Sequence, residues 1–84
     1  MMVESEITFI NRATIRVQMQ IYDGRTLAGT CVAGPGEIGV LPAAMERYDI
    51  YLKNSATGWE IFHKLNSALK TLTLTQQNGR FVIT

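Results

Sequence analysis

Alternation of apolar and polar side chains marks residues 14–22 as the clearest element of the chain. Four apolar residues occupy every second position: Ile15, Val17, Met19 and Ile21. A period of two places successive side chains on opposite faces of a sheet, so this pattern predicts a half-buried strand. Asp23-Gly24 follows directly. Because this dipeptide tolerates the positive φ of tight turns, residues 25–33 are expected to return as the second strand of a hairpin.

Glycine and proline interrupt the alternation in the following part of the chain. Gly29 lies inside the returning strand, where a glycine indicates a sharp bend or the close approach of another backbone. Residues 34–46 contain three glycines and two prolines, and this composition predicts an irregular surface insertion. Alternation resumes over residues 47–53, which predict a third strand with Tyr48 and Ile50 on one face.

Residues 56–71 fit two different structures. Thr57 and Glu60 have the spacing of a capping box, and the apolar residues after them recur at helical spacing, so the local pattern slightly favours a helix. The same region also divides into two strand-like runs, 59–65 and 69–75, of which the second alternates threonine with leucine. The local pattern leaves both structures open.

The two ends of the chain carry weaker signals. Val3, Ile7 and Ile10 fall on one face at helical spacing, which predicts a brief N-terminal helix over residues 3–10. Asn78-Gly79 has the composition of a hairpin turn and precedes a short apolar run, so a C-terminal β-hairpin is expected.

The length and composition of the chain indicate one small globular domain over residues 1–84. Hydrophobic residues make up 46% of the sequence and charged residues 18%, which is unlike the composition of disordered proteins. A chain of this length buries only roughly 60% of its unfolded surface, so its stability alone should be marginal. Oligomerisation is therefore expected.

Charge and cysteine content narrow the possible functions. Eight Lys and Arg residues stand against seven Asp and Glu residues, for a net charge of +1, which argues against nucleic-acid binding by bulk charge but not against binding by stacking and a few placed cations. No apolar run approaches the ~20 residues of a membrane span, and no signal peptide is evident. The lone Cys31 excludes an internal disulfide, so a cytoplasmic location is expected.

Two stretches resemble the Sm-like family, which includes the Lsm and Hfq-like proteins. The first begins at Phe9-Ile10-Asn11-Arg12 and continues through the alternating strand and Asp23-Gly24 to Gly29. The second, Tyr48-Asp49-Ile50-Tyr51-Leu52-Lys53-Asn54, is similar to the third strand of Hfq. A looser similarity covers Ile61-Phe62-His63-Lys64 and the residues up to Leu69, which in the family form the fourth strand, a loop and the fifth strand.

The resemblance implies an all-β fold, namely a small five-stranded, SH3-like barrel with a short N-terminal helix and an insertion at about 34–46. In Sm-like proteins the fourth strand of one subunit pairs with the fifth strand of the next. This head-to-tail contact implies a closed homo-oligomeric ring of about five to seven subunits. The family function implies binding of single-stranded, U- or A-rich RNA without catalysis and without a cofactor.

The resemblance also implies a set of RNA-binding residues. Tyr48 corresponds to an aromatic residue that stacks on a base, with Arg47 and Asp49 beside it, while His63 and Lys64 correspond to the loop that lines the pore. No catalytic residue or metal ligand is predicted, because one histidine and one cysteine are too few for a zinc site or for an acid–base constellation.

Two other function classes remain open at this stage. One is a ring-forming structural or protein-interaction module with no RNA role, which the near-neutral charge favours. The other is a sugar- or lipid-binding β-sandwich that displays Trp59 and Tyr51, and only the aromatic residues support it.

Overall fold

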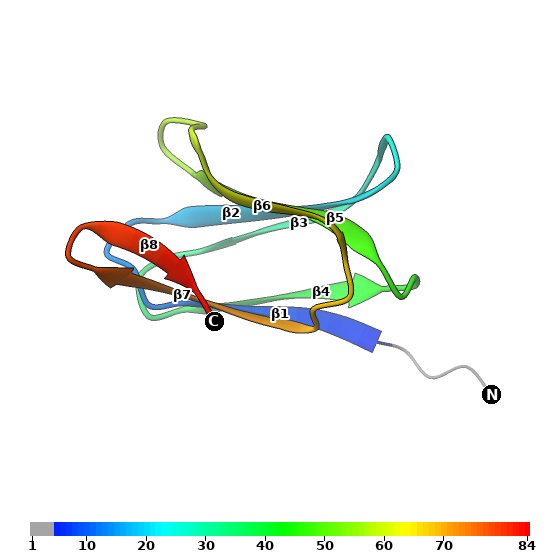
Figure 1. Ribbon diagram of the computed structural model, residues 1–84, viewed down its shortest axis with the longest axis horizontal. Helices are drawn as coiled ribbons and strands as arrows, with labels where there is room; N and C mark the ends of the chain where they lie inside the picture. Colours follow the sequence, from blue (N-terminus) through cyan, green and yellow to red (C-terminus); the bar gives the residue numbers. More distant parts are fainter. Residues whose placement is uncertain (1–4) are drawn as a thin grey trace.

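Two layers of β-sheet make up the fold (Figure 1). The computed structural model describes residues 5–84, which form eight strands and no helix. The first sheet has the strand order β4-β1-β7-β8 and consists of β1 (Ser5–Asn11), β4 (Ile38–Ala43), β7 (Thr71–Gln77) and β8 (Arg80–Ile83). The second has the order β3-β2-β5-β6 and consists of β2 (Val17–Asp23), β3 (Thr26–Ala33), β5 (Tyr48–Asn54) and β6 (Glu60–Ser67).

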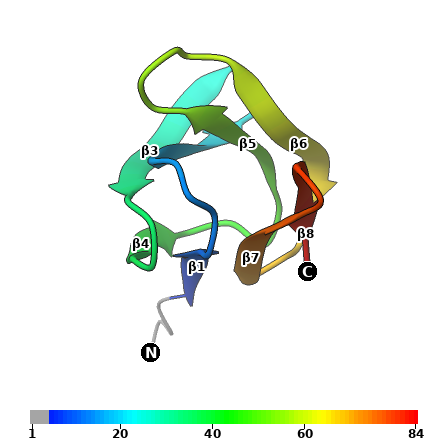
Figure 2. The same cartoon turned by 90° about the vertical axis from the view of Figure 1, so that its left-hand side faces the viewer.

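The inner faces of the two central strand pairs form the core. Every second residue of these strands is fully buried: Ile7 and Phe9 on β1, Val17, Met19 and Ile21 on β2, Ile50 and Leu52 on β5, and Leu72 and Leu74 on β7. The alternation that predicted the strand within residues 14–22 is therefore confirmed, and burial of each such side chain contributes about 1.5–3 kcal/mol. Figure 2 shows the arrangement of the strands of both sheets from one end of the molecule.

Two hairpin turns predicted from the sequence are confirmed. Asp23 pairs with Thr26 across the β2–β3 turn, where Gly24 has a φ of 62°. At the C-terminus, Asn78 and Gly79 both have positive φ values and close the β7–β8 hairpin. A tight turn that matches the twist of paired strands needs positive φ at both central residues, as at Asn78-Gly79, or at the first of them, as at Gly24.

The predicted N-terminal helix is wrong within the described residues, although Val3 lies outside them. Residues 5–11 form the strand β1, which pairs antiparallel with β4 and parallel with β7. Ile7, Phe9 and Asn11 are buried while the residues between them are more exposed, so the period that the fold uses is two. Pairing on both sides overrides the weak helical spacing.

The irregular insertion predicted at 34–46 is also wrong in its central part. Residues 38–43 form β4, and Leu41 and Ala43 belong to the core. Asn11 N–H donates to the carbonyl of Glu37. In this antiparallel register, the backbone N–H and C=O groups of the odd-numbered residues of β4 face β1, and those of the even-numbered residues, including Pro42, face away from it. The missing N–H of Pro42 therefore points to the open edge, where no ladder bond is lost.

The region that allowed either a helix or strands forms β6 and β7. The capping-box interpretation of Thr57 is wrong, since its hydroxyl accepts a hydrogen bond from Trp59 N–H within a turn. The five-stranded barrel is likewise wrong: the described strands form two four-stranded sheets, and neither closes. The coarser prediction, an all-β fold, is confirmed. Within residues 5–84 there is no helix long and apolar enough to cross a membrane.

Candidate binding face

A row of aromatic side chains crosses the outer face of the second sheet. Tyr22 on β2 and Tyr51 on β5 make an edge-to-face contact with ring centroids 5.6 Å apart. Tyr51 is also the register partner of His63 on β6, and those two rings lie 6.0 Å apart at an interplanar angle of 32°. We call Tyr22, Tyr51 and His63 the aromatic row. It exists because strand alternation sends these residues outward while their neighbours fill the core.

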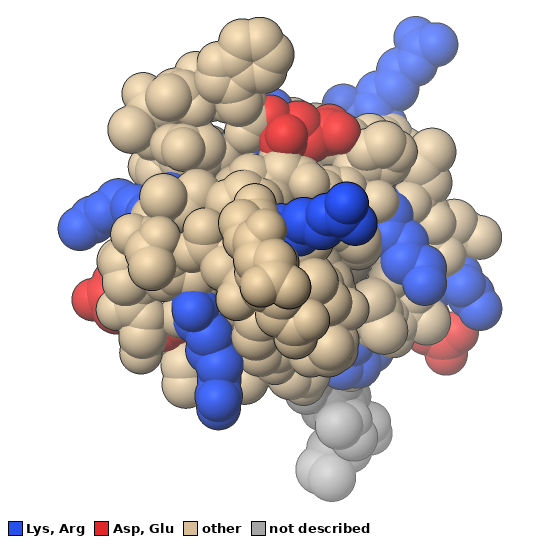
Figure 3. All heavy atoms as spheres, turned by 60° about the vertical axis from the view of Figure 1, so that its left-hand side comes forward, with Lys and Arg blue, Asp and Glu red and all other residues tan. Residues whose placement is uncertain are grey.

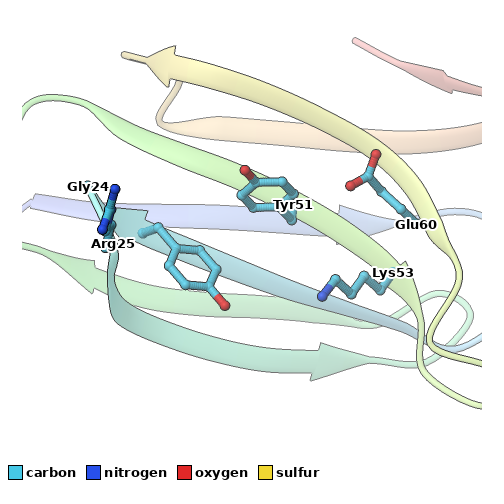
Figure 4. Close-up of a pocket in the computed structure, with 6 residues that line it drawn as sticks. Gly24, Arg25, Tyr51, Lys53 and Glu60 are labelled. Atoms are coloured by element: carbon cyan, nitrogen blue, oxygen red, sulfur yellow. The ribbon is translucent and has the colours of Figure 1, made fainter.

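A shallow depression of about 400 Å³ adjoins the aromatic row (Figure 4). In this view Tyr51 lies in the middle, Arg25 lies toward one end, and Lys53 and Glu60 lie toward the other. The β2–β3 turn supplies Arg25, while β5 and β6 supply the remaining charged groups. Aromatic surface flanked by cations at both ends suits an elongated ligand that carries planar groups and negative charge.

Of the charged side chains that line the depression, the carboxylate has an ionic partner and the two cations have none among the described residues. Glu60 Oε2 lies 2.7 Å from His63 Nδ1, so the one carboxylate of the depression is bonded to the end of the aromatic row. Arg25 and Lys53 form no ion pair within residues 5–84, which leaves both cations available to an anionic ligand. Figure 3 shows Lys and Arg side chains spread over the viewed face among other residues.

Gln20 lies next to the aromatic row and has an unusual environment. It is the register partner of Tyr51, and its side-chain oxygen Oε1 is buried without a hydrogen-bond partner among the described residues. A buried acceptor left unpaired costs about 1–3 kcal/mol.

Tyr48, the predicted base-stacking residue, does not belong to this face. Its ring is 4% exposed and lies in the core, and its hydroxyl accepts a hydrogen bond of 2.8 Å from Met45 N–H. A buried ring offers no surface for stacking. The stacking role predicted for Tyr48 therefore does not agree with the structure, because strand alternation turns Tyr48 inward and Tyr51 outward.

Arg47 and Asp49 hold a bulge in β6. Arg47 Nη1 donates to the carbonyl of Asn66 at 3.0 Å, and Asn66 N–H donates to Asp49 Oδ1 at 2.8 Å. Asn66 has a φ of 52°, where the β5–β6 register shifts. Both predicted site residues therefore stabilise the positive φ of Asn66, a backbone conformation that residues other than glycine rarely adopt.

His63 and Lys64 were predicted to lie together, and the structure separates them. His63 pairs with Tyr51 on the outer face, whereas Lys64 pairs with Ile50, whose side chain is in the core. Adjacent residues of a strand point to opposite sides of the sheet. Of the predicted residues, only His63 joins the aromatic row.

Sequence reasoning missed the main members of the candidate site. Tyr22, Arg25 and Lys53 were not singled out, and Tyr51 was noted only as a displayed aromatic residue in a minor alternative. The alternation within residues 14–22 and 47–53 could have identified those that lie on β2 and β5, because the positions between the buried apolar residues face outward and carry the polar and aromatic side chains.

Two kinds of reactive group can be checked in the described part of the chain, namely metal clusters and the cysteine thiol. No three His, Cys, Asp or Glu side chains within residues 5–84 come together as a metal cluster. Burial raises the pKa of the Cys31 thiol above its ordinary value, so the thiol is protonated at neutral pH and is a poor nucleophile. Comparison of the chain with family models, curated proteins and solved structures gave no match.

Proposed function

We propose that this protein binds single-stranded RNA, without catalysis, on the outer face of the second sheet. The observation that carries the proposal is the aromatic row, with the unpaired cations Arg25 and Lys53 lining the depression beside it. Stacking of a base on an aromatic side chain is worth about 1–3 kcal/mol and does not require a large basic excess. A chain with a net charge of +1 can bind RNA in this way.

The Sm-like resemblance supports the ligand class, since members of that family bind U- or A-rich single strands. The proposed platform differs from the one that the family motif implies, because Tyr51 and not Tyr48 offers its ring to solvent. Gln20 adds a reason for base preference: a carboxamide can pair with the donor and acceptor edge of adenine or uracil.

Fluorescence anisotropy with labelled uridine and adenine oligomers tests the proposal. Tyr51→Ala should weaken binding about 5- to 150-fold, the equivalent of one lost stacking contact. Phe81→Ala is the matched control, because Phe81 is an exposed aromatic residue on β8 of the other sheet. No binding at low salt, or equal effects of the two substitutions, would contradict the proposal.

The cations can be tested in the same assay. Arg25→Ala and Lys53→Ala should each reduce the slope of affinity against salt concentration, because each removes a contact with phosphate. Arg80→Ala, on β8, is the control that should leave the slope unchanged.

A ring-forming or protein-interaction module is the second candidate, and the sheet edges favour it. Strands β3, β4, β6 and β8 are edge strands in the two sheets, and Ile38 on β4 is 61% exposed. Unpaired edges can pair with another copy, and a head-to-tail contact of this kind closes into a ring. Native mass spectrometry would report the number of subunits. A ring of about five to seven subunits that binds no RNA would favour this candidate.

A further inference from the structure

The loop between β5 and β6 holds the only tryptophan of the sequence out in solvent. Trp59 is 77% exposed and is the most exposed large hydrophobic residue in the described part of the chain. A single exposed apolar side chain is common in proteins, so exposure alone does not indicate a role. The loop that carries it supplies the second observation.

Hydrogen bonds fix the backbone of this loop. Asn54 Oδ1 accepts from the N–H groups of Ala56 and Thr57, and the Asn54 carbonyl accepts from Gly58 N–H, where φ is 77°. The carbonyl of Trp59 accepts from Asn54 N–H at 2.8 Å, and its own N–H donates to the Thr57 hydroxyl. Both backbone groups of Trp59 are therefore engaged, and its ring is presented from a preorganised loop, which lowers the entropy lost on binding.

The loop borders the proposed site. Trp59 directly precedes Glu60, which lines the depression, and its bond to Asn54 places its backbone beside the residue that follows Lys53. In Figure 1 the β5–β6 loop and the β2–β3 turn both rise on the outer side of the second sheet, at opposite ends. Lys53 thus lies between Tyr51 and the tryptophan loop along the chain.

We infer that Trp59 is a second stacking platform, which extends the RNA site beyond Lys53. This inference rests on the proposed function. One base stacks on Tyr51, a further base stacks on Trp59, and Lys53 contacts phosphate between them. Two separated aromatic platforms with a cation between them favour a flexible, charged single strand over a compact ligand. Engagement of Glu60 by His63 lowers the repulsion that its carboxylate would exert on phosphate.

Intrinsic fluorescence tests the inference directly, because all tryptophan emission comes from Trp59. A uridine oligomer of about eight nucleotides should quench this emission with the same Kd as anisotropy reports. Trp59→Ala should weaken binding about tenfold, and Trp59→Phe should retain most of the affinity, since a smaller ring still stacks. Phe81→Ala serves again as the control, and circular dichroism checks that each variant is folded.

The outcomes separate this inference from the proposed function. Anisotropy that shows Tyr51-dependent binding, with no quenching and no effect of Trp59→Ala, would overturn the inference and leave the proposed function standing. No RNA binding by the wild-type chain at low salt would overturn both. Quenching by neutral oligosaccharides but not by RNA would also overturn both and would identify a carbohydrate as the ligand.

Discussion

Individual side chains show how one position along a strand decides a role. Tyr48 and Tyr51 belong to the same strand, but the first is buried in the core and the second lies in the aromatic row. A motif match cannot make this distinction when the register of the strand is unknown. The same applies to His63 and Lys64, which are adjacent in sequence and lie on opposite sides of β6.

Asn11 is the polar residue on which the fold depends most clearly. It is fully buried, its Nδ2 donates to the carbonyls of Ile15 and Ala33, and its Oδ1 accepts from Ala13 N–H. Asn11→Ala should destabilise the protein by about 1–3 kcal/mol or more, because two buried backbone groups and one part-buried backbone group lose their partners. Urea unfolding measures this loss. Gln77→Ala, at an exposed position, should change stability by less than about 0.5 kcal/mol, and an equally small effect of Asn11→Ala would contradict this role.

Cys31 gives stability a dependence on alkaline pH. Burial raises the pKa of its thiol in the folded state, and a backbone hydrogen bond to Met19 partly offsets the rise. A raised pKa means that the stabilising, protonated form is fully present below the unfolded pKa. Stability from this group is then lost as pH rises through the folded pKa, above the ordinary value of 9.0.

Urea midpoints at about pH 8 and about pH 10.5 measure this dependence. The comparison is with Cys31→Ala, which should lose less stability between the two pH values than the wild-type chain. Identical losses in both proteins would show that the thiol does not contribute.

At the scale of elements, local pattern predicted strands wherever the alternation was long. The β2–β3 hairpin, the third strand and the C-terminal hairpin all followed from alternation and turn residues. β1 and β4 were missed because their strand character comes from pairing with each other. The glycines and prolines within 34–46 led to the prediction of an irregular segment instead of β4. An edge strand accepts proline where the backbone N–H makes no ladder hydrogen bond, and it accepts glycine where no side chain has to pack.

Gly39 shows why β4 needs a glycine. A Cβ at this position would lie 2.7 Å from Cys31 Sγ, whereas a Cβ at Gly29 would meet its nearest atom, Leu41 Cδ2, at 3.4 Å. The sequence predicted a sharp bend or a close backbone approach at Gly29, whereas the closer contact of these two positions is at Gly39 and involves the side chain of Cys31. Gly29 lies instead beside the register shift of the β2–β3 pair.

Alanine substitutions separate the two glycines. Gly39→Ala should cost about 1–3 kcal/mol, the usual cost of overpacking, and should cost more than Gly29→Ala. Thermal unfolding of both variants provides the measurement. Adding Cys31→Ala to Gly39→Ala should recover part of the loss, because it removes the sulfur that the new methyl group meets. Equal costs at the two glycines, with no recovery in the double variant, would contradict this packing.

At the scale of the whole molecule, the two outer faces differ in chemistry. The outer face of the second sheet carries the aromatic row and the depression with its cations. On the first sheet, the paired residues Ile10 and Ile38 contribute apolar surface, and Val40 lies two residues along β4. The sequence predicted an all-β domain, but composition carries no information about which face of a sheet gathers the aromatic residues. That property appears only once the register is known.

NMR chemical-shift mapping tests most directly whether RNA binds the outer face of the second sheet. A uridine oligomer added to isotopically labelled protein at low salt should perturb the resonances of Tyr22, Tyr51, Lys53 and His63. It should leave those of the first sheet, including Ile38, unchanged. Perturbations confined to the first sheet, or the absence of any perturbation, would contradict RNA binding at the outer face of the second sheet.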